Sequence, residues 1–594
     1  MQVSPTKTPK MKINSISIKL FFGLMLPFLG WSQGEEKDNL GIQQVTVTKS
    51  YSPSLSNVFK IRSKPEVNDS LSKKKLGVNY TFLSLPVIST FVPNKASPLK
   101  LQKQEATFFY NSYVSGGLGN KSSFLLDAAM MLPLDRSQGL GFDFRRSAVS
   151  GVEGTLLPSD QSRTTLNLLH QYKTKSLNVN SDFRFDRQNH NFYGISEGDR
   201  TNFDSSPTDN TDAKQHLNYL SIRSKWQWYE SPFSKLYFNT SITTDYFDTT
   251  ENILKINTQM RFPLFGKYLE VTPGFQLVNT DFKTAYYSDE PLSFKEGLTD
   301  LEVQFLNIGK KLKFRVGTHA FYALGNDNKK SAVFVYPKFE LSYSPKSQKM
   351  IPFINYQGHY DLNSFTSFSL QNPYVSPTLS LESTEVLHEG KIGFNATPGS
   401  GLRFRFAAVY SKSNRHPLFK RLPFDLKSSE VPFRLANTYG IVYDEIEKKG
   451  FETSISLRFN ENNKLTLETR YSDYQSTVEK HAWNLPAIEI DLKGNFRFGQ
   501  KLFVQFIGNY IGKREVAAWD VFLNQPLEDA LEKTATLSGV FSISSNVTYK
   551  LNSSWDVFYE AKVRLGKETA RWAHYENHNQ LHLVGIRYKF DLNL

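Results

Sequence analysis

The stretch LKFRVGTHA at residues 312–320 alternates apolar and polar side chains. Phe314 and Val316 fall on one side of this alternation, and Lys313 and Arg315 fall on the other. Because successive side chains of a β-strand point to opposite faces, the stretch predicts a strand with one apolar and one charged face. The same pattern recurs at residues 333–343, 402–410, 451–459, 488–498 and 557–565, so the sequence predicts an all-β fold.

The segments between the expected strands alternate in length. A soluble β-sandwich would also alternate apolar and polar residues. In bacterial outer-membrane barrels, however, short periplasmic turns and long external loops alternate along the chain. The sequence therefore predicts a transmembrane antiparallel β-barrel. The short connectors are residues 172–176, 307–311, 344–349 and 461–464, and the long ones are residues 188–213, 361–384, 412–437 and 514–531.

Counting back from the C-terminal strand gives about 22 strands between residues 105 and 594. With an even number of strands, the first and the last strand both have their free chain ends on the periplasmic side. A barrel this wide also has a lumen that the side chains of its wall do not fill. Residues 437–445 are interpreted as an extracellular extension of the strand that finishes at Phe459. The predicted strand ends include residues 186, 228, 361, 412 and 498.

The composition agrees with a membrane barrel. The 594 residues are 39% hydrophobic and 14% aromatic, with a mean hydropathy of −0.42. This composition, polar on average but rich in aromatic residues, is typical of a membrane barrel, because only every second residue of its strands faces lipid. The absence of Cys excludes disulfides, thiolate metal sites, a cysteine nucleophile and a lipoprotein anchor. No 18-residue apolar run follows residue 32, so no transmembrane helix is expected in the mature chain.

Residues 1–32 have the features of a secretory signal peptide. A basic start is followed by an apolar core at residues 20–30, and Gly30 and Ser32 occupy the small-residue positions before a cleavage at Gln33. We therefore expect an exported protein. The net charge of the whole chain is +14, spread without the Lys/Arg blocks typical of nucleic-acid binding.

The chain ends on an expected strand that contains Gly585, Tyr588 and Phe590 in a Gly-x-x-aromatic-x-aromatic pattern. The pattern resembles the C-terminal assembly signal of bacterial outer-membrane barrels. The resemblance implies recognition by the barrel-assembly machinery during insertion. Two departures from the family pattern are Leu583, where a polar residue is usual, and the four residues that follow Phe590.

Residues 33–104 form a short N-terminal segment, periplasmic or lumenal, that is rich in Pro, Ser and Lys. An exported 22-strand barrel resembles the TonB-dependent outer-membrane receptors of Gram-negative bacteria, and this start resembles small receptor-like proteins of Bacteroidetes. The resemblance implies that a TonB box in this segment adds a strand to the energy-coupling protein TonB. The family's plug is a longer globular domain with glycine-rich motifs, so this chain lacks a full plug. The residues that resemble the TonB box are Gln44, Val45, Thr46, Val47 and Thr48.

The sequence contains no catalytic motif. The nucleophile elbow, the P-loop, the dinucleotide fingerprint and the His-Glu-x-x-His motif do not occur. His574, His578 and His582 would align on a helix, but their segment is expected to be a loop and a strand, where the rings do not converge. His319 is expected to face the lumen beside Arg315. We therefore predict no enzyme, no metal site and no cofactor.

The aromatic residues at strand ends fit the girdles that barrels place at the two membrane interfaces. Aromatic residues in the expected external loops, including Phe365, Phe368 and Tyr374, leave a sugar-stacking role open. The residues expected in the girdles are Phe183, Phe185, Trp226, Trp228, Tyr471 and Tyr474.

The resemblance implies outer-membrane transport of a nutrient or ligand, with external loops that capture the solute and a polar lumen that passes it. The implied partners are outer-membrane lipid, TonB or a surface lipoprotein, and the barrel-assembly machinery. The alternative is a non-transporting barrel subunit of an outer-membrane secretion or barrel-assembly complex, which the missing plug favours. Deletion of residues 44–48 distinguishes the two.

Overall fold

A computed structural model describes residues 111–195, 212–325, 330–346, 348–424, 432–435, 438–520, 529–566 and 570–592. The expected signal peptide, the segment 33–104 and the TonB-box-like residues 44–48 lie outside the described residues. Within the described ranges, no helix is long and apolar enough to cross a membrane.

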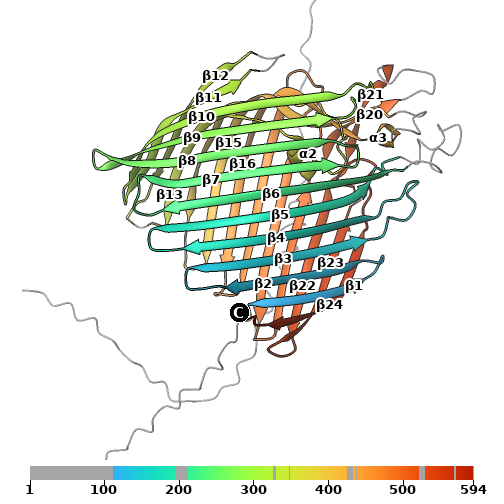
Figure 1. The fold of residues 1–594 in the computed structure, drawn as a ribbon, viewed down its shortest axis with the longest axis horizontal. Coiled ribbons are helices and arrows are strands. Elements are labelled where there is room, and N and C mark those ends of the chain that lie inside the picture. Colours follow the sequence, from blue (N-terminus) through green and yellow to red (C-terminus); the bar gives the residue numbers. More distant parts are fainter. Residues whose placement is uncertain are drawn as a thin grey trace, which may run out of the picture. The chain divides into compact units, whose positions relative to one another are not determined.

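Twenty-two strands form one antiparallel sheet that closes on itself (Figure 1). The first strand, β1 (Ser112–Gly119), pairs with β2 (Phe124–Pro133) on one side and with the last strand, β24 (Gln580–Phe590), on the other. Closure leaves the sheet without an edge that could pair with another chain. The predicted all-β barrel of 22 strands is confirmed.

The other strands of the barrel follow in chain order, and each pairs antiparallel with the next. Their bounds are β3 (Gln138–Val149), β4 (Gln161–Lys173), β5 (Leu177–Asn191), β6 (Lys214–Trp228), β7 (Phe233–Asp245), β8 (Thr250–Leu264), β9 (Lys267–Phe282), β10 (Leu292–Ile308), β11 (Leu312–Leu324), β12 (Ala332–Tyr343), β13 (Met350–Asp361), β14 (Thr384–Ala396), β15 (Leu402–Arg421), β16 (Tyr439–Arg458), β17 (Lys464–Ser476), β18 (Ile488–Phe498), β19 (Leu502–Ile511), β22 (Val540–Lys550) and β23 (Trp555–Leu565).

One long connector contains a hairpin that the sequence analysis did not predict. The strands β20 (Arg514–Asp520) and β21 (Leu531–Leu537) pair with each other as a separate two-stranded sheet, and β19 pairs directly with β22. Val516 and Leu537 of the hairpin are buried in a small cluster with Ala573. The long connector expected at residues 514–531 is therefore present, but it contains a hairpin that burial against another loop stabilises.

The connectors at the two ends of the barrel differ in length as predicted. At one end they are short, and the turn at Phe265 and Gly266 has positive φ at both residues, 48° and 68°, as a tight hairpin turn requires. At the other end lie long loops, including residues 362–383. By the rule for outer-membrane barrels, the short turns face the periplasm and the long loops face outward.

Two strands extend further outward than predicted. β5 continues to Asn191 and β15 continues to Arg421, beyond the predicted ends near residues 186 and 412. β15 pairs along its extension with β16, past a register shift between Ser413 and His416. Residues 439–445 belong to β16, so their interpretation as an extension of the strand that ends near Phe459 is confirmed, while residue 437 lies outside the described residues.

The two faces of the barrel wall have opposite character. On the outer face of β24, Val584 and Ile586 are 58% and 54% exposed, as expected of the apolar residues that a barrel presents to lipid. The inner face carries ion pairs such as Lys391 with Glu452, at 3.0 Å. His319 lies on this face and binds Asp300, at 2.9 Å between Nε2 and Oδ2, so its predicted lumenal position is confirmed.

The seam between β1 and β24 depends on a glycine. Gly585 lies opposite Gly117, and the ring of Phe558 from β23 packs over it. A Cβ atom at Gly585 would lie 2.3 Å from Cζ of Phe558 and 2.5 Å from the carbonyl oxygen of Gly116. Phe558 is buried with Leu583 and one residue of β2, so the seam has a small core of its own. The glycine therefore makes room for an aromatic side chain at the point of closure.

The two aromatic residues of the C-terminal pattern lie on the outer side of the seam. Tyr588 is 42% exposed, its ring stacks on that of Phe590, and it lies 4.8 Å from Trp555 between ring centroids. The geometry gives these residues a place at the membrane-facing surface. Their role as an assembly signal remains a prediction.

Candidate functional site

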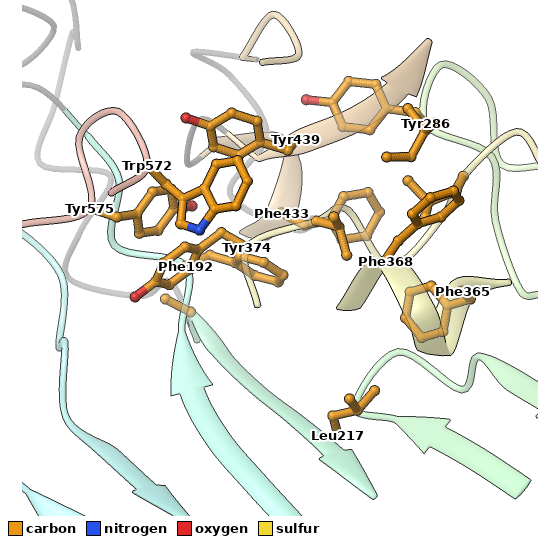
Figure 2. Packing of buried hydrophobic residues seen from close by; sticks show 14 of the residues in the cluster. Phe192, Leu217, Tyr286, Phe365, Phe368, Tyr374, Phe433, Tyr439, Trp572 and Tyr575 are labelled. Carbon is orange, nitrogen blue, oxygen red and sulfur yellow. The ribbon is translucent and has the colours of Figure 1, made fainter. Parts of the chain in front are cut away.

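Long loops from around the barrel meet in one buried hydrophobic cluster (Figure 2). We call this cluster the loop lid. Its residues come from strand ends and from the loops that follow β3, β5, β9, β13, β15 and β23, so segments far apart in the sequence share one core. The buried residues of the loop lid are Leu157, Phe192, Tyr193, Ile195, Ala213, Leu217, Phe282, Tyr286, Phe365, Phe368, Tyr374, Val375, Leu379, Leu381, Phe433, Leu435, Tyr439, Ile441, Trp572 and Tyr575.

The loop at residues 362–383 contributes six of the buried residues of the lid. It contains the helix α2 (Phe365–Gln371), whose N-cap Ser364 accepts a hydrogen bond from the backbone N–H of Ser367. A second short helix, α3 (Pro432–Leu435), brings Phe433 into the same cluster. Figure 1 shows both helices at the end of the barrel that carries the β20–β21 hairpin.

A buried carboxylate on the barrel wall holds the loop 362–383. Glu251 of β8 is 0% exposed and accepts hydrogen bonds from the backbone N–H groups of Phe365, at 2.7 Å, and Thr366, at 2.9 Å. The hydroxyl of Thr280 donates a third bond to this carboxylate, at 2.6 Å. A carboxylate at the first turn of a helix satisfies N–H groups that have no partner within the helix. Since Glu251 and Thr280 point into the lumen, the loop folds inward.

Tyr374, in the second half of the loop at residues 362–383, contacts residues that are distant in the sequence. Its ring stacks on Tyr575, with centroids 3.6 Å apart, and its hydroxyl contacts that of Tyr193 at 3.3 Å. Gln161 of β4 also donates to this hydroxyl, at 3.3 Å. Burial raises the pKa of the hydroxyls of Tyr374 and Tyr575, so both stay protonated.

The three clustered histidines have separate partners. His574 accepts a hydrogen bond from Arg421 at 2.6 Å, because burial lowers the pKa of His574 to about 3 and keeps the ring neutral. Nε2 of His578 lies 2.8 Å from the carbonyl oxygen of Ser150. His582 binds the hydroxyl of Tyr559, which lies on the outer face. In the part of the chain that the structure describes, no three potential ligands gather for a metal ion.

Two expectations for aromatic residues need correction. Phe365, Phe368 and Tyr374 are between 1% and 5% exposed, so they belong to the core of the lid and present no face for stacking a sugar. Tyr474 packs on the lumenal side against a cluster around Trp483, because its strand turns it inward, and so it does not join a girdle.

Tyr471 and Trp226 are exposed on their strands, as girdle residues would be. Tyr471 is 39% exposed, and Trp226 is 36% exposed and stacks on Trp228. The girdle positions of these two residues, and of Trp228, Phe183 and Phe185, remain predictions.

A cavity of about 690 Å³ lies under the lid. Pro373 and Tyr374 of the inward-folded loop border it, and strands β2, β3, β4, β5, β19, β22, β23 and β24 supply its wall. Its lining is mixed, with charged, amide and hydroxyl side chains beside apolar ones. The charged residues of the lining are Arg145, Arg163, Glu560 and Lys562, and its amide residues are Gln161, Gln188, Asn189, Gln505 and Asn546.

Sequence analysis placed these residues on strands and loops but did not bring them together. The sequence signal for the lid was the high content of apolar and aromatic residues at 365–381. Such residues are unusual in an external loop that is exposed to water, so they indicate burial. The wall residues of the cavity gave no signal, because polar side chains line the lumen along every strand.

Comparison with known proteins identifies the fold. No protein-family model matches the chain, and no curated protein matches it by sequence. Among solved structures, the FrpB iron transporter of Neisseria meningitidis is similar, with a TM-score of 0.57 at 10% identity over 81% of each chain. The pyoverdine receptor FpvA of Pseudomonas aeruginosa has a TM-score of 0.57 at 12% identity, over 82% of this chain and 79% of that one.

The ferric enterobactin receptor PfeA of Pseudomonas aeruginosa, solved as a mutant, is also similar, with a TM-score of 0.55 at 11% identity over 81% of this chain and 80% of that one. At such identities the likeness establishes the fold alone. The closed sheet, its apolar outer face and this likeness make the chain an integral outer-membrane barrel of 22 strands.

Proposed function

We propose that this barrel imports a solute across the outer membrane in the manner of TonB-dependent receptors, and that it is not an enzyme. The loop lid captures and encloses the solute, and the polar lumen passes it. Residues 33–104 couple or gate the passage in place of a longer plug. The segment that adds a strand to TonB is Gln44, Val45, Thr46, Val47 and Thr48.

The observation that carries this proposal is the packed loop lid above a cavity of mixed polar and apolar lining. A 22-strand barrel has a lumen far wider than its wall side chains can fill. A packed hydrophobic lid of loops would obstruct an open diffusion pore, and a scaffold does not require a cavity beneath such a lid. Loops packed over a cavity suit a channel that opens only when a ligand or an energy source moves them.

The similar structures support the same reading. FrpB is described as an iron transporter, and FpvA as a receptor bound to pyoverdine. Their shared architecture with this chain is a reason to propose import, while the solute and the Bacteroidetes origin remain predictions. A surface lipoprotein that delivers the solute is a further partner that we propose on the family resemblance.

Proline substitutions in the TonB-box-like segment test the proposal. Strand addition uses backbone N–H groups, which proline lacks, so Val45→Pro combined with Val47→Pro is expected to abolish coupling. A deletion strain is complemented with each variant and grown on single limiting sources of iron, carbohydrate or peptide. The wild type should restore growth on at least one source, and the proline variant should not.

The matched control is Val45→Ile with Val47→Ile, which keeps the N–H groups and the extended preference and should restore growth fully. If the proline variant supports growth as well as the wild type does, energised import is wrong. Recovery of secretion or barrel-assembly subunits with the tagged protein would then favour the scaffold alternative.

A further inference from the structure

We infer that the outer face of the barrel carries a binding site for a phosphorylated lipid of the outer leaflet of the membrane. The site lies on the neighbouring strands β3, β4 and β5, close to the ends of these strands that lead into long loops (Figure 1). It concerns the lipid-facing side of the wall, so it goes beyond the import of a solute through the lumen and does not depend on it.

Two arginines flank one threonine on this face. Arg146 of β3 and Arg187 of β5 both lie directly opposite Thr164 of β4, one on each side of it. Because successive side chains of a strand point to opposite faces, these three point away from the lumen. The residues next to them in sequence line the lumenal cavity: Arg145, Arg163 and Gln188. Neighbouring strands lie about 4.8 Å apart, so the two arginines are held roughly 10 Å apart with the threonine between them.

The two arginines have no acidic neighbour on the outer face. Arg146 lies opposite Leu126 and Thr164, and Arg187 lies opposite Thr164 and Asn218. Among the residues that the structure describes, neither arginine forms an ion pair with a carboxylate. The diagonal neighbours of the two on the same face are apolar, hydroxyl or imidazole residues: Phe124, Ala128, Ser162, Leu166, His216 and Leu220.

The carboxylates of the nearby rim do not neutralise this pair of charges. Asp160 lies four residues farther out than Thr164, roughly 13 Å along an extended chain, and accepts a hydrogen bond from the amide of Asn191 at 3.1 Å. Asp212, which precedes β6, contacts Lys214 at 3.6 Å. Exposed charges are screened over about 8 Å at physiological ionic strength. The positive potential at the two arginines therefore persists.

Hydrogen bonds orient the donors of the site. Asn189 accepts a hydrogen bond from Nε of Arg187 at 3.1 Å and donates one to the hydroxyl of Ser162 at 2.8 Å. The terminal Nη groups of Arg187 and the hydroxyl of Thr164 have no hydrogen-bond partner in the described part of the chain. The guanidinium of Arg146 lies 6.0 Å from the centre of the ring of Phe124. Guanidinium groups are the preferred partners of phosphate oxygens, which they bind in pairs of hydrogen bonds.

Apolar rows on the periplasmic side of the arginines supply a surface for acyl chains. The next two rows across β3, β4 and β5 contain only Phe and Leu on the outer face, and none of these side chains is buried. A cationic row above apolar rows matches a lipid with a phosphate on its head group, and basic clusters at a membrane surface recognise such head groups. A soluble anion would use only the first row. The apolar residues are Phe144, Leu166 and Phe185 in one row and Phe142, Leu168 and Phe183 in the other.

Other outward cations of the barrel show the contrast. Lys412 of β15 contacts Glu445 at 2.8 Å, and Lys449 of β16 contacts Glu447 at 2.6 Å. These lysines are also partly or fully exposed, but each has a carboxylate of its own on the same face. They provide a matched control for the unpaired arginines of β3 and β5.

Lipid binding by the purified full chain in detergent tests the inference. The protein is freed of co-purified lipid and titrated with monophosphoryl lipid A, and native mass spectrometry measures the fraction that carries one lipid molecule. The wild type should bind this probe saturably. The double variant Arg146→Gln, Arg187→Gln should bind at least tenfold more weakly, since it loses both charge-assisted contacts with the phosphate. Both side chains are exposed, so the substitutions leave no cavity in the wall.

Two control variants separate this site from a general effect of positive charge. The variant Lys412→Gln, Lys449→Gln removes two outward cations that are already paired and should bind as the wild type does. The variant Arg146→Lys, Arg187→Lys keeps both charges and should retain most of the binding. An equal loss in the two Gln variants, or no saturable binding by the wild type, would overturn the site.

Two further ligands identify the occupant. The same lipid without its phosphate should bind the wild type at least tenfold more weakly, and inorganic phosphate in about tenfold excess should not displace the lipid. Equal binding of the dephosphorylated lipid would mean that acyl chains alone are recognised, and full displacement by inorganic phosphate would identify a soluble anion. Either result contradicts the inference. None of these measurements involves TonB or residues 44–48, so the import proposal stands or fails separately.

Discussion

Replacement of Glu251 by alanine is expected to release the loop 362–383 from the barrel wall. The substitution leaves the buried N–H groups of Phe365 and Thr366 without an acceptor, at a cost of about 1–3 kcal/mol each. The chain has no Cys, so one introduced thiol is the sole labelling site. A cysteine at Ser369, which is 5% exposed, should react with a membrane-impermeant maleimide at least tenfold faster in the Glu251→Ala background.

A buried carboxylate on the adjacent strand, near the short turn at the opposite end of the barrel, provides the control for this experiment. Glu270 of β9 is 4% exposed and binds Arg261, at 2.6 Å, without contacting the loop. Glu270→Ala should leave the labelling rate at Ser369→Cys unchanged, and Glu251→Gln, which keeps one carbonyl acceptor, should give an intermediate rate. Equal labelling in all backgrounds would mean that Glu251 does not hold the loop.

Valine at Gly585 is expected to prevent stable closure of the barrel. Its side chain would collide with the ring of Phe558 and with the backbone of Gly116, and the backbone of a closed seam has little room to shift. Folded barrels migrate as compact, heat-sensitive species in detergent gels. The Gly585→Val variant should lose most of that compact species, while Gly116→Val should keep it, because a Cβ at Gly116 has no neighbour closer than 4.0 Å.

Unassisted folding separates the two roles of Gly585. If the residue serves only as a recognition element for the assembly machinery, purified unfolded Gly585→Val protein should refold into detergent micelles as the wild type does. The seam geometry predicts that refolding fails in micelles as well. Normal refolding together with poor insertion in cells would contradict the steric account and support the assembly signal.

The lipid-facing part of the barrel could be predicted from the sequence because the bilayer imposes a period of two. The predicted ends at residues 228, 361 and 498 coincide with the ends of β6, β13 and β18. Outside the membrane that constraint stops. The extension of β15 after Lys412 includes Pro417 and has no apolar face toward lipid, so its alternation is lost although its backbone pairing continues.

The lid and the cavity could not be predicted for a different reason. Tyr193, Tyr374 and Tyr575 are neighbours only after the barrel closes, and no local pattern links them. The β20–β21 hairpin has strands too short to show a clear period, and its burial comes from another loop. Aromatic residues in a loop indicate that part of the loop is buried. Which residues they pack against depends on the order of the strands around the barrel.

The shared core of the loop lid has a consequence for how the mouth opens. Its members come from loops on all sides of the ring, so withdrawal of one loop exposes apolar surface on its neighbours. Such a structure favours concerted movement, in which the loops leave together or stay together. Single-barrel current recordings should then show two discrete conductance levels, with abrupt transitions, and no continuum of partly open states.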